Sequence, residues 1–168
     1  MPPRGSEQTP MRASSASRAS DLITSWSAFR SEVERSIGLL QHIRLQVSLF
    51  AVRLGVGCDG ATVGAVAGTL ARLGTVGWLA DGRIGLLYMG PRATGQAGDA
   101  GLMQHVRTMI ERRLAERGFS VPGDWLELSA THAWTDEISG IDELSRPLFE
   151  RRERRGSVLI APFARFAH

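Results

Sequence analysis

The dipeptide Asp81-Gly82 constrains the fold of this chain more than any other feature of its sequence. It separates two short runs rich in apolar and β-branched residues, 75–80 and 83–89. Asp-Gly is among the dipeptides best suited to a two-residue type I′ turn, in which both central residues take a positive φ. The sequence therefore predicts an antiparallel β-hairpin with its turn at Asp81-Gly82.

Apolar residues at helical spacing predict four helices around this hairpin. The first runs from 27 to about 44, the second covers 63–73, and the third covers 102–114. The fourth passes through Leu148 and follows the sequence Ser139-Gly140-Ile141-Asp142, which resembles a capping box.

Three further apolar runs predict strands. Residues 47–54 form a β-branched and aromatic run bounded by glycines, which is typical of a strand buried on both faces. Residues 125–132 alternate like a strand with one face on a core, and 157–161 predict a short strand that closes the chain.

The order of these elements predicts the α+β class. We expect a split β-α-β-β-α-β core, ferredoxin-like or palm-like, with an antiparallel-containing sheet and helices on one sheet face. An extra N-terminal helix and a C-terminal helix and strand complete it. Residues 1–20, rich in Ser, Pro, Arg and Ala, predict a disordered tail, which leaves 21–168 as one domain.

Composition excludes several kinds of chemistry. The chain has neither Lys nor Asn, so all 20 basic residues are Arg, and no amine is available for Schiff-base catalysis or a Walker phosphate loop. The net charge is only +3, which argues against a nucleic-acid partner. No apolar run is long enough for a membrane span or a signal peptide, so we expect a cytoplasmic protein.

The glycines after the first predicted strand allow a second interpretation. Gly55-x-Gly57-x-x-Gly60 lies between a strand and a helix, as in the dinucleotide-binding fingerprint, with Asp81 placed to contact a ribose. This alternative is an NAD-binding oxidoreductase of the Rossmann type. A hairpin at Asp81-Gly82 argues against it, because that fold needs a crossover helix there.

Motifs at both ends of the core resemble GGDEF domains, the diguanylate cyclase family with a palm-like nucleotide cyclase fold. The similarity covers 21 to about 160, in order, although each motif is degenerate. The matching segments are Asp21-Leu22-Ile23-Thr24-Ser25-Trp26, residues 78–87 around Asp81-Gly82, Leu126 to Ala133 followed by Ile141-Asp142-Glu143-Leu144, and the basic run 151–156.

Departures from the family pattern predict a loss of activity. The resemblance implies phosphoryl transfer on GTP with two divalent metals, held by carboxylates at the first strand and at the turn. Here no Asp or Glu occurs between Glu34 and Asp59, and Ala80-Asp81-Gly82-Arg83-Ile84 replaces Gly-Gly-Asp-Glu-Phe. The family's guanine-reading Asn and phosphate lysines have no counterpart. In its product-inhibition motif, Arg72 matches the arginine but Thr75 stands at the acidic position.

The resemblance therefore implies a catalytically inactive GGDEF-like regulatory or protein-interaction module of bacterial signalling, without cofactor or metal. Asp59, Asp81, Gly82 and Arg83 would line a vestigial nucleotide pocket, and Arg72 would mark a vestigial product-inhibition site. Their alternative roles are structural: a loop acid, turn residues and a surface arginine.

The sequence is also compatible with four further hypotheses. Residual diguanylate cyclase activity would use GTP with Mg or Mn, with Asp59 and Asp81 as metal ligands. A guanine nucleotide could be a ligand only, and the domain could be a homodimer with an unidentified protein partner. Cys58 is either a thiol made reactive by a helix N-terminus or, more simply, a bystander.

Overall fold

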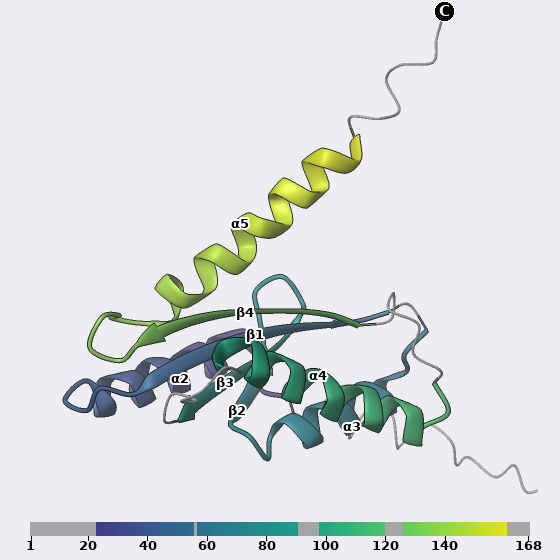
Figure 1. The fold of residues 1–168 in the computed structure, drawn as a ribbon, viewed down its shortest axis with the longest axis horizontal. Coiled ribbons are helices and arrows are strands. Elements are labelled where there is room, and N and C mark those ends of the chain that lie inside the picture. Colours follow the sequence, from purple (N-terminus) through teal and green to yellow (C-terminus); the bar gives the residue numbers. More distant parts are fainter. Residues whose placement is uncertain (1–22, 56, 91–97, 120–125, 161–168) are drawn as a thin grey trace, which may run out of the picture.

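The computed structural model describes residues 23–55, 57–90, 98–119 and 126–160, the last ten of them by backbone only. The expected N-terminal tail, 1–20, lies outside the described residues. Figure 1 shows the arrangement of helices and strands. In chain order they are α2 (Trp26–Leu40), β1 (Gln46–Leu54), α3 (Gly60–Leu70), β2 (Thr75–Trp78), β3 (Ile84–Gly90), α4 (Gly98–Glu116), β4 (Leu126–Trp134) and α5 (Ile141–Ile160).

The described strands form one antiparallel sheet in the order β2-β3-β1-β4. The α+β class and the antiparallel pairing around Asp81 are therefore confirmed. Because β3 lies between β1 and β2, the β1-α3-β2 unit is split by an antiparallel strand. The NAD-binding alternative is wrong on this point, since every ladder between the described strands is antiparallel and the element next after Asp81 is strand β3, not a helix.

The turn of the hairpin differs from the predicted type I′ geometry. Gly82 has a φ of 78°, but no residue other than glycine has a positive φ in the described chain, so Asp81 does not adopt the left-handed conformation. The amide of Leu79 donates to the carbonyl of Arg83, and Gly82 N–H donates to Leu79 O. Ala80, Asp81 and Gly82 thus make a three-residue loop that ends in a left-handed glycine.

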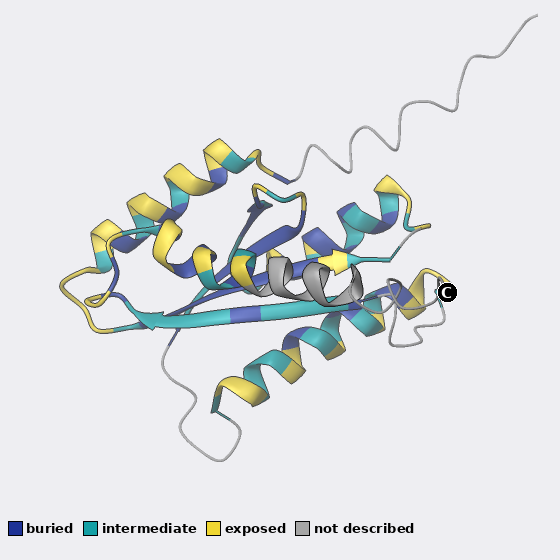
Figure 2. Ribbon diagram, turned by 90° about the horizontal axis from the view of Figure 1, so that it is seen from above, coloured by how far each residue is buried: buried dark blue, intermediate teal, exposed yellow. Residues whose placement is uncertain are grey.

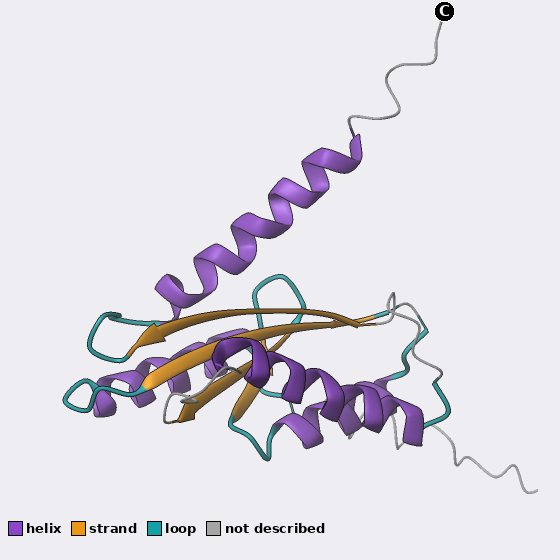
Figure 3. Ribbon diagram, viewed as in Figure 1, coloured by secondary structure: helices purple, strands orange, loops and turns teal. Residues whose placement is uncertain are grey.

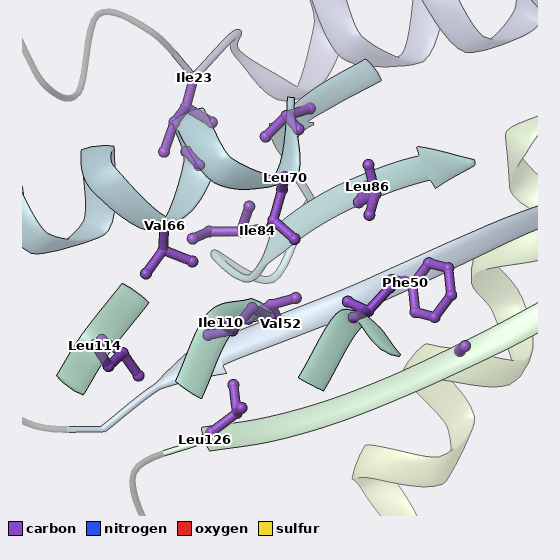
Figure 4. Packing of buried hydrophobic residues seen from close by; sticks show 14 residues of the cluster. Ile23, Phe50, Val52, Val66, Leu70, Ile84, Leu86, Ile110, Leu114 and Leu126 are labelled. Atoms are coloured by element: carbon purple, nitrogen blue, oxygen red, sulfur yellow. The ribbon is translucent and has the colours of Figure 1, made fainter. Parts of the chain in front are cut away.

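Strand β1 separates two hydrophobic cores. It is buried almost throughout, whereas β4 at the sheet edge is mostly half-buried (Figure 2). Phe50 and Val52 face a core with α3 and α4, into which Val66, Leu70, Ile110 and Leu114 point (Figure 4). Val47, Leu49 and Ala51 face the opposite core, with α2 and the first half of α5. The two helices of the predicted core, α3 and α4, share one face of the sheet, as expected. The two additional helices, α2 and α5, cover the other face, because a strand that is apolar on both sides needs cover on both.

The predicted C-terminal strand at 157–161 is also wrong. Helix α5 continues without a break to Ile160 and its end extends away from the sheet (Figures 1 and 3). The Arg- and Glu-rich stretch before residue 157 favours helix. A strand there would have to pair with a sheet edge, whereas the end of α5 lies away from the sheet. Residue 161 lies outside the described residues.

Helices α2 and α3 each begin with a side-chain cap. Ser25 accepts from the amide of Ala28 at the start of α2, and Asp59 accepts from the amide of Thr62 at the start of α3. At α5 the expected partner of Ser139 was Asp142, but Ser139 bonds Glu143 instead. Asp142 is engaged elsewhere, with Arg30 Nη2 2.7 Å from its carboxylate. None of the helices described here combines the length and the apolar character that crossing a membrane requires.

Gly74 offers a direct test of this packing. A Cβ at Gly74 would lie 2.0 Å from the carbonyl oxygen of Leu87, which is backbone and cannot yield. We expect Gly74→Ala to lower the free energy of unfolding by about 2 kcal/mol in urea denaturation. The matched control is Gly38→Ala, where a Cβ meets open space and helix propensity adds up to about 1 kcal/mol. Equal stabilities of the two variants would contradict the described register.

Candidate functional site

The residues expected to line a nucleotide pocket lie at one end of the sheet. Strands β1 and β2 both run antiparallel to β3, so they point the same way. The loop after β1, which leads through Asp59 into α3, and the turn after β2, which holds Asp81, therefore lie at the same end. The topology does bring together the elements that carry these residues.

The carboxylate of Asp81 is already paired. Its Oδ2 lies 2.7 Å from Nε of Arg83, and its Oδ1 accepts from the amide of Arg83 at 3.3 Å. The side chain of Arg83 is only 3% exposed and that of Asp81 15%. This arginine is not the surface residue that the sequence allowed, and the turn is closed by an intramolecular ion pair.

Arg83 also joins the turn to the far side of the sheet. Its Nη1 donates to Ser129 Oγ on β4 at 3.2 Å, and its Nη2 donates to the carbonyl of Leu148 on α5 at 3.3 Å. The guanidinium lies 5.8 Å from the ring centroid of Phe149. In the row of register partners that contains Ser129, the residues from β1 and β3 are Ala51 and Gly85, which are both small.

Asp59 serves α3 as its N-terminal cap. The hydrogen bonds from Thr62 lower the pKa of the Asp59 carboxyl, with a smaller contribution from Arg117. The pKa of the neighbouring Cys58 thiol is raised, mainly by burial and to a smaller extent by the charge of Asp59. Burial and the nearby carboxylate both oppose the lowering that a helix N-terminus would cause, which argues against the reactive-thiol interpretation of Cys58.

Among the described residues, metal-ligating side chains do not gather at this end of the sheet. Over the described ranges, no three His, Cys, Asp or Glu residues are grouped so that they could hold a metal ion. Ser48 and His132 form a polar pair toward the other end of β1. They are register partners, and Ser48 Oγ lies 2.7 Å from Nδ1 of His132. Because Ser48 is fully buried, we assign this pair a structural role.

Arg72 lies in a groove between α3 and α4 with a volume of about 750 Å³. Helix α3 contributes a stripe without large side chains. Its members are Ala61, Gly64, Ala65, Gly68 and Thr69. Since Thr75 begins β2 and is not acidic, Arg72 has no carboxylate from the motif position that the resemblance compares with the product-inhibition site.

The α4 side of the groove is cationic, and sequence reasoning missed it. The residues there are Met109, Arg112, Arg113, Glu116 and Arg117. Glu116 lies 2.8 Å from Nη1 of Arg113 and 3.4 Å from Nε of Arg112, and the bond from Arg113 lowers the pKa of Glu116. One glutamate thus faces four arginines, if Arg72 is included. The signal in the sequence was the spacing 109, 112, 113, 116, 117, which is one face of a helix.

Comparison with protein-family models, with curated proteins and with solved structures returned no match.

The buried ion pair makes a stability prediction. We expect Arg83→Ala to reduce the free energy of unfolding by about 3 kcal/mol, because it removes the guanidinium that pairs with the carboxylate of Asp81 and donates to the carbonyl of Leu148. Arg83→Lys keeps the charge but loses the directed bonds to Ser129 and Leu148, so it should recover only part of this. Amide hydrogen exchange should rise in α5 in both variants. Unchanged exchange in α5 would contradict a role of Arg83 in holding that helix.

Proposed function

We propose that this protein is a catalytically inactive, GGDEF-like regulatory domain that acts through contacts with other proteins. The order β2-β3-β1-β4 supports the ferredoxin-like or palm-like arrangement that this family implies. The segment that precedes α2 also supports this arrangement, because it lies along β2. The carbonyl of Thr24 accepts a hydrogen bond from the amide of Trp78 at 2.9 Å.

The ion pair between Asp81 and Arg83 is the observation that carries the proposal. Two-metal catalysis needs carboxylates that are free to coordinate cations. Here both oxygens of Asp81 accept hydrogen bonds from Arg83, whose positive charge occupies the same turn. A divalent metal would have to displace a buried guanidinium that also bonds Ser129 and Leu148.

Residual cyclase activity is the second candidate, with Asp59 and Asp81 as metal ligands. The exposed position of Asp59 favours it, since an exposed carboxylate can accept a cation. Its use as the cap of α3 and the pairing of Asp81 argue against it. Dimer formation also stays a prediction, for which the exposed side chains of Leu39 and Ile43 offer apolar surface.

Incubation of the full chain with GTP and Mn²⁺ tests the proposal. We expect chromatography to detect no cyclic dinucleotide, with an active diguanylate cyclase as the positive control. A product peak that disappears in Asp81→Asn would establish the cyclase alternative and refute inactivity. Thermal shifts with GTP plus Mn²⁺ and with cyclic di-GMP, measured in parallel, distinguish a nucleotide sensor from a domain that contacts proteins only.

A further inference from the structure

We propose that the groove between α3 and α4 binds an acidic amphipathic helix of a partner protein. This inference rests on the proposed function and names the surface through which such a domain would act.

The shape of the groove fits an elongated helical element. Ala61, Gly64, Ala65 and Gly68 recur at i, i+3, i+4 and i+7, so they share one face of α3. Gly64 is buried on this face, Ala61 and Ala65 are half-buried, and Gly68 is exposed. This face extends for about 10 Å at the helical rise of 1.5 Å per residue. Small side chains let another backbone approach closely, and a helix laid in a groove is a recurring mode of peptide recognition.

The charge of the groove selects an acidic occupant. Arg112, Arg113 and Arg117 lie along the α4 side, and Arg72 lies on the α3 side. Glu116 is shared between Arg112 and Arg113, which leaves a net positive lining. In addition, Nε of Arg113 is buried and has no hydrogen-bond partner in the described part of the chain. Carboxylates on one side of a bound helix would form ion pairs with these guanidinium groups.

The helices in the described part of the chain supply no such element. None of α2, α3, α4 and α5 carries a net negative charge, so a second copy offers no acidic helix among the described ones. Residues 1–22 contain three Arg against one Glu and one Asp, and residues 161–168 contain one Arg and no acid. We therefore assign the complementary segment to a different protein.

A helix also fits better than a nucleic acid. Phosphate backbones are bound mainly through repeated cation contacts and need no apolar floor. This groove has Met109 and a floor of Ala and Gly beside its arginines, and Glu116 lies among them. An amphipathic helix would place small apolar residues on the floor and carboxylates toward the guanidinium groups.

Gly68 gives a clean way to block the groove. A Cβ at Gly68 meets no atom within 4 Å, so Gly68→Leu should fold normally while its side chain occupies the groove. The matched control is Gly38→Leu on α2, where the added Cβ also meets open space. Arg112→Glu tests the charge, with Arg35→Glu on α2 as its control. Circular dichroism and thermal melts check that all four variants are folded.

The probe is a displayed library of 16-residue helical peptides, with small apolar residues at i, i+3, i+4 and i+7 and the other positions randomised over Glu, Lys, Ser and Gln. Selection on the full chain should enrich Glu. We expect the enriched peptides to bind Gly68→Leu and Arg112→Glu at least tenfold more weakly than the unmodified protein. Binding to Gly38→Leu and Arg35→Glu should stay within twofold.

Three outcomes would overturn the inference. The library fails to enrich, the enriched peptides are not acidic, or they bind Gly68→Leu and Gly38→Leu equally well. A labelled 20-nucleotide single strand is tested in parallel, and its binding with the same loss in Arg112→Glu would assign the groove to nucleic acid instead. None of these results depends on GTP turnover, so failure here is distinguishable from failure of the proposed function.

Discussion

The two-sided burial of β1 is the constraint on which the rest of the structure depends. Its residues Phe50 and Val52 face one core and Leu49 and Ala51 the other, and all four are almost completely inaccessible to solvent. Such a strand is stable only between two layers, because one uncovered face would expose a row of large apolar side chains. This requirement places α3 and α4 on one side and α2 and α5 on the other, and it fixes β1 inside the sheet.

The buried guanidinium of Arg83 links this architecture to the functional argument. A charge that is 3% exposed must be paired, and Arg83 finds Asp81 in its own turn and further acceptors on β4 and α5. The same contacts that hold α5 on the sheet also occupy the carboxylate that a metal-dependent cyclase would need. The stability of this end of the sheet and the inactivity that we propose therefore depend on the same guanidinium.

Local patterns predicted much of the fold, and non-local contacts account for what they missed. Turn chemistry at Asp81-Gly82 predicted the antiparallel pairing, and a continuous apolar run predicted the burial of β1. The burial of Arg83 was not predictable in this way, because its partners Ser129 and Leu148 lie 46 and 65 residues further along the chain. The groove was missed for the same reason. The small face of α3 and the cationic face of α4 are each visible in the sequence, but only the fold places them side by side.

The central claim is that the carboxylate of Asp81 is held in an ion pair with Arg83. Paramagnetic broadening by Mn²⁺ tests it most directly. Mn²⁺ is titrated into the ¹⁵N-labelled full chain while the amide signals of Asp81 and Gly82 are followed. The ion pair predicts that both signals keep their intensity at equimolar metal, as the amides of α2 do. Selective loss of the Asp81 and Gly82 signals, abolished by Asp81→Asn, would contradict the account.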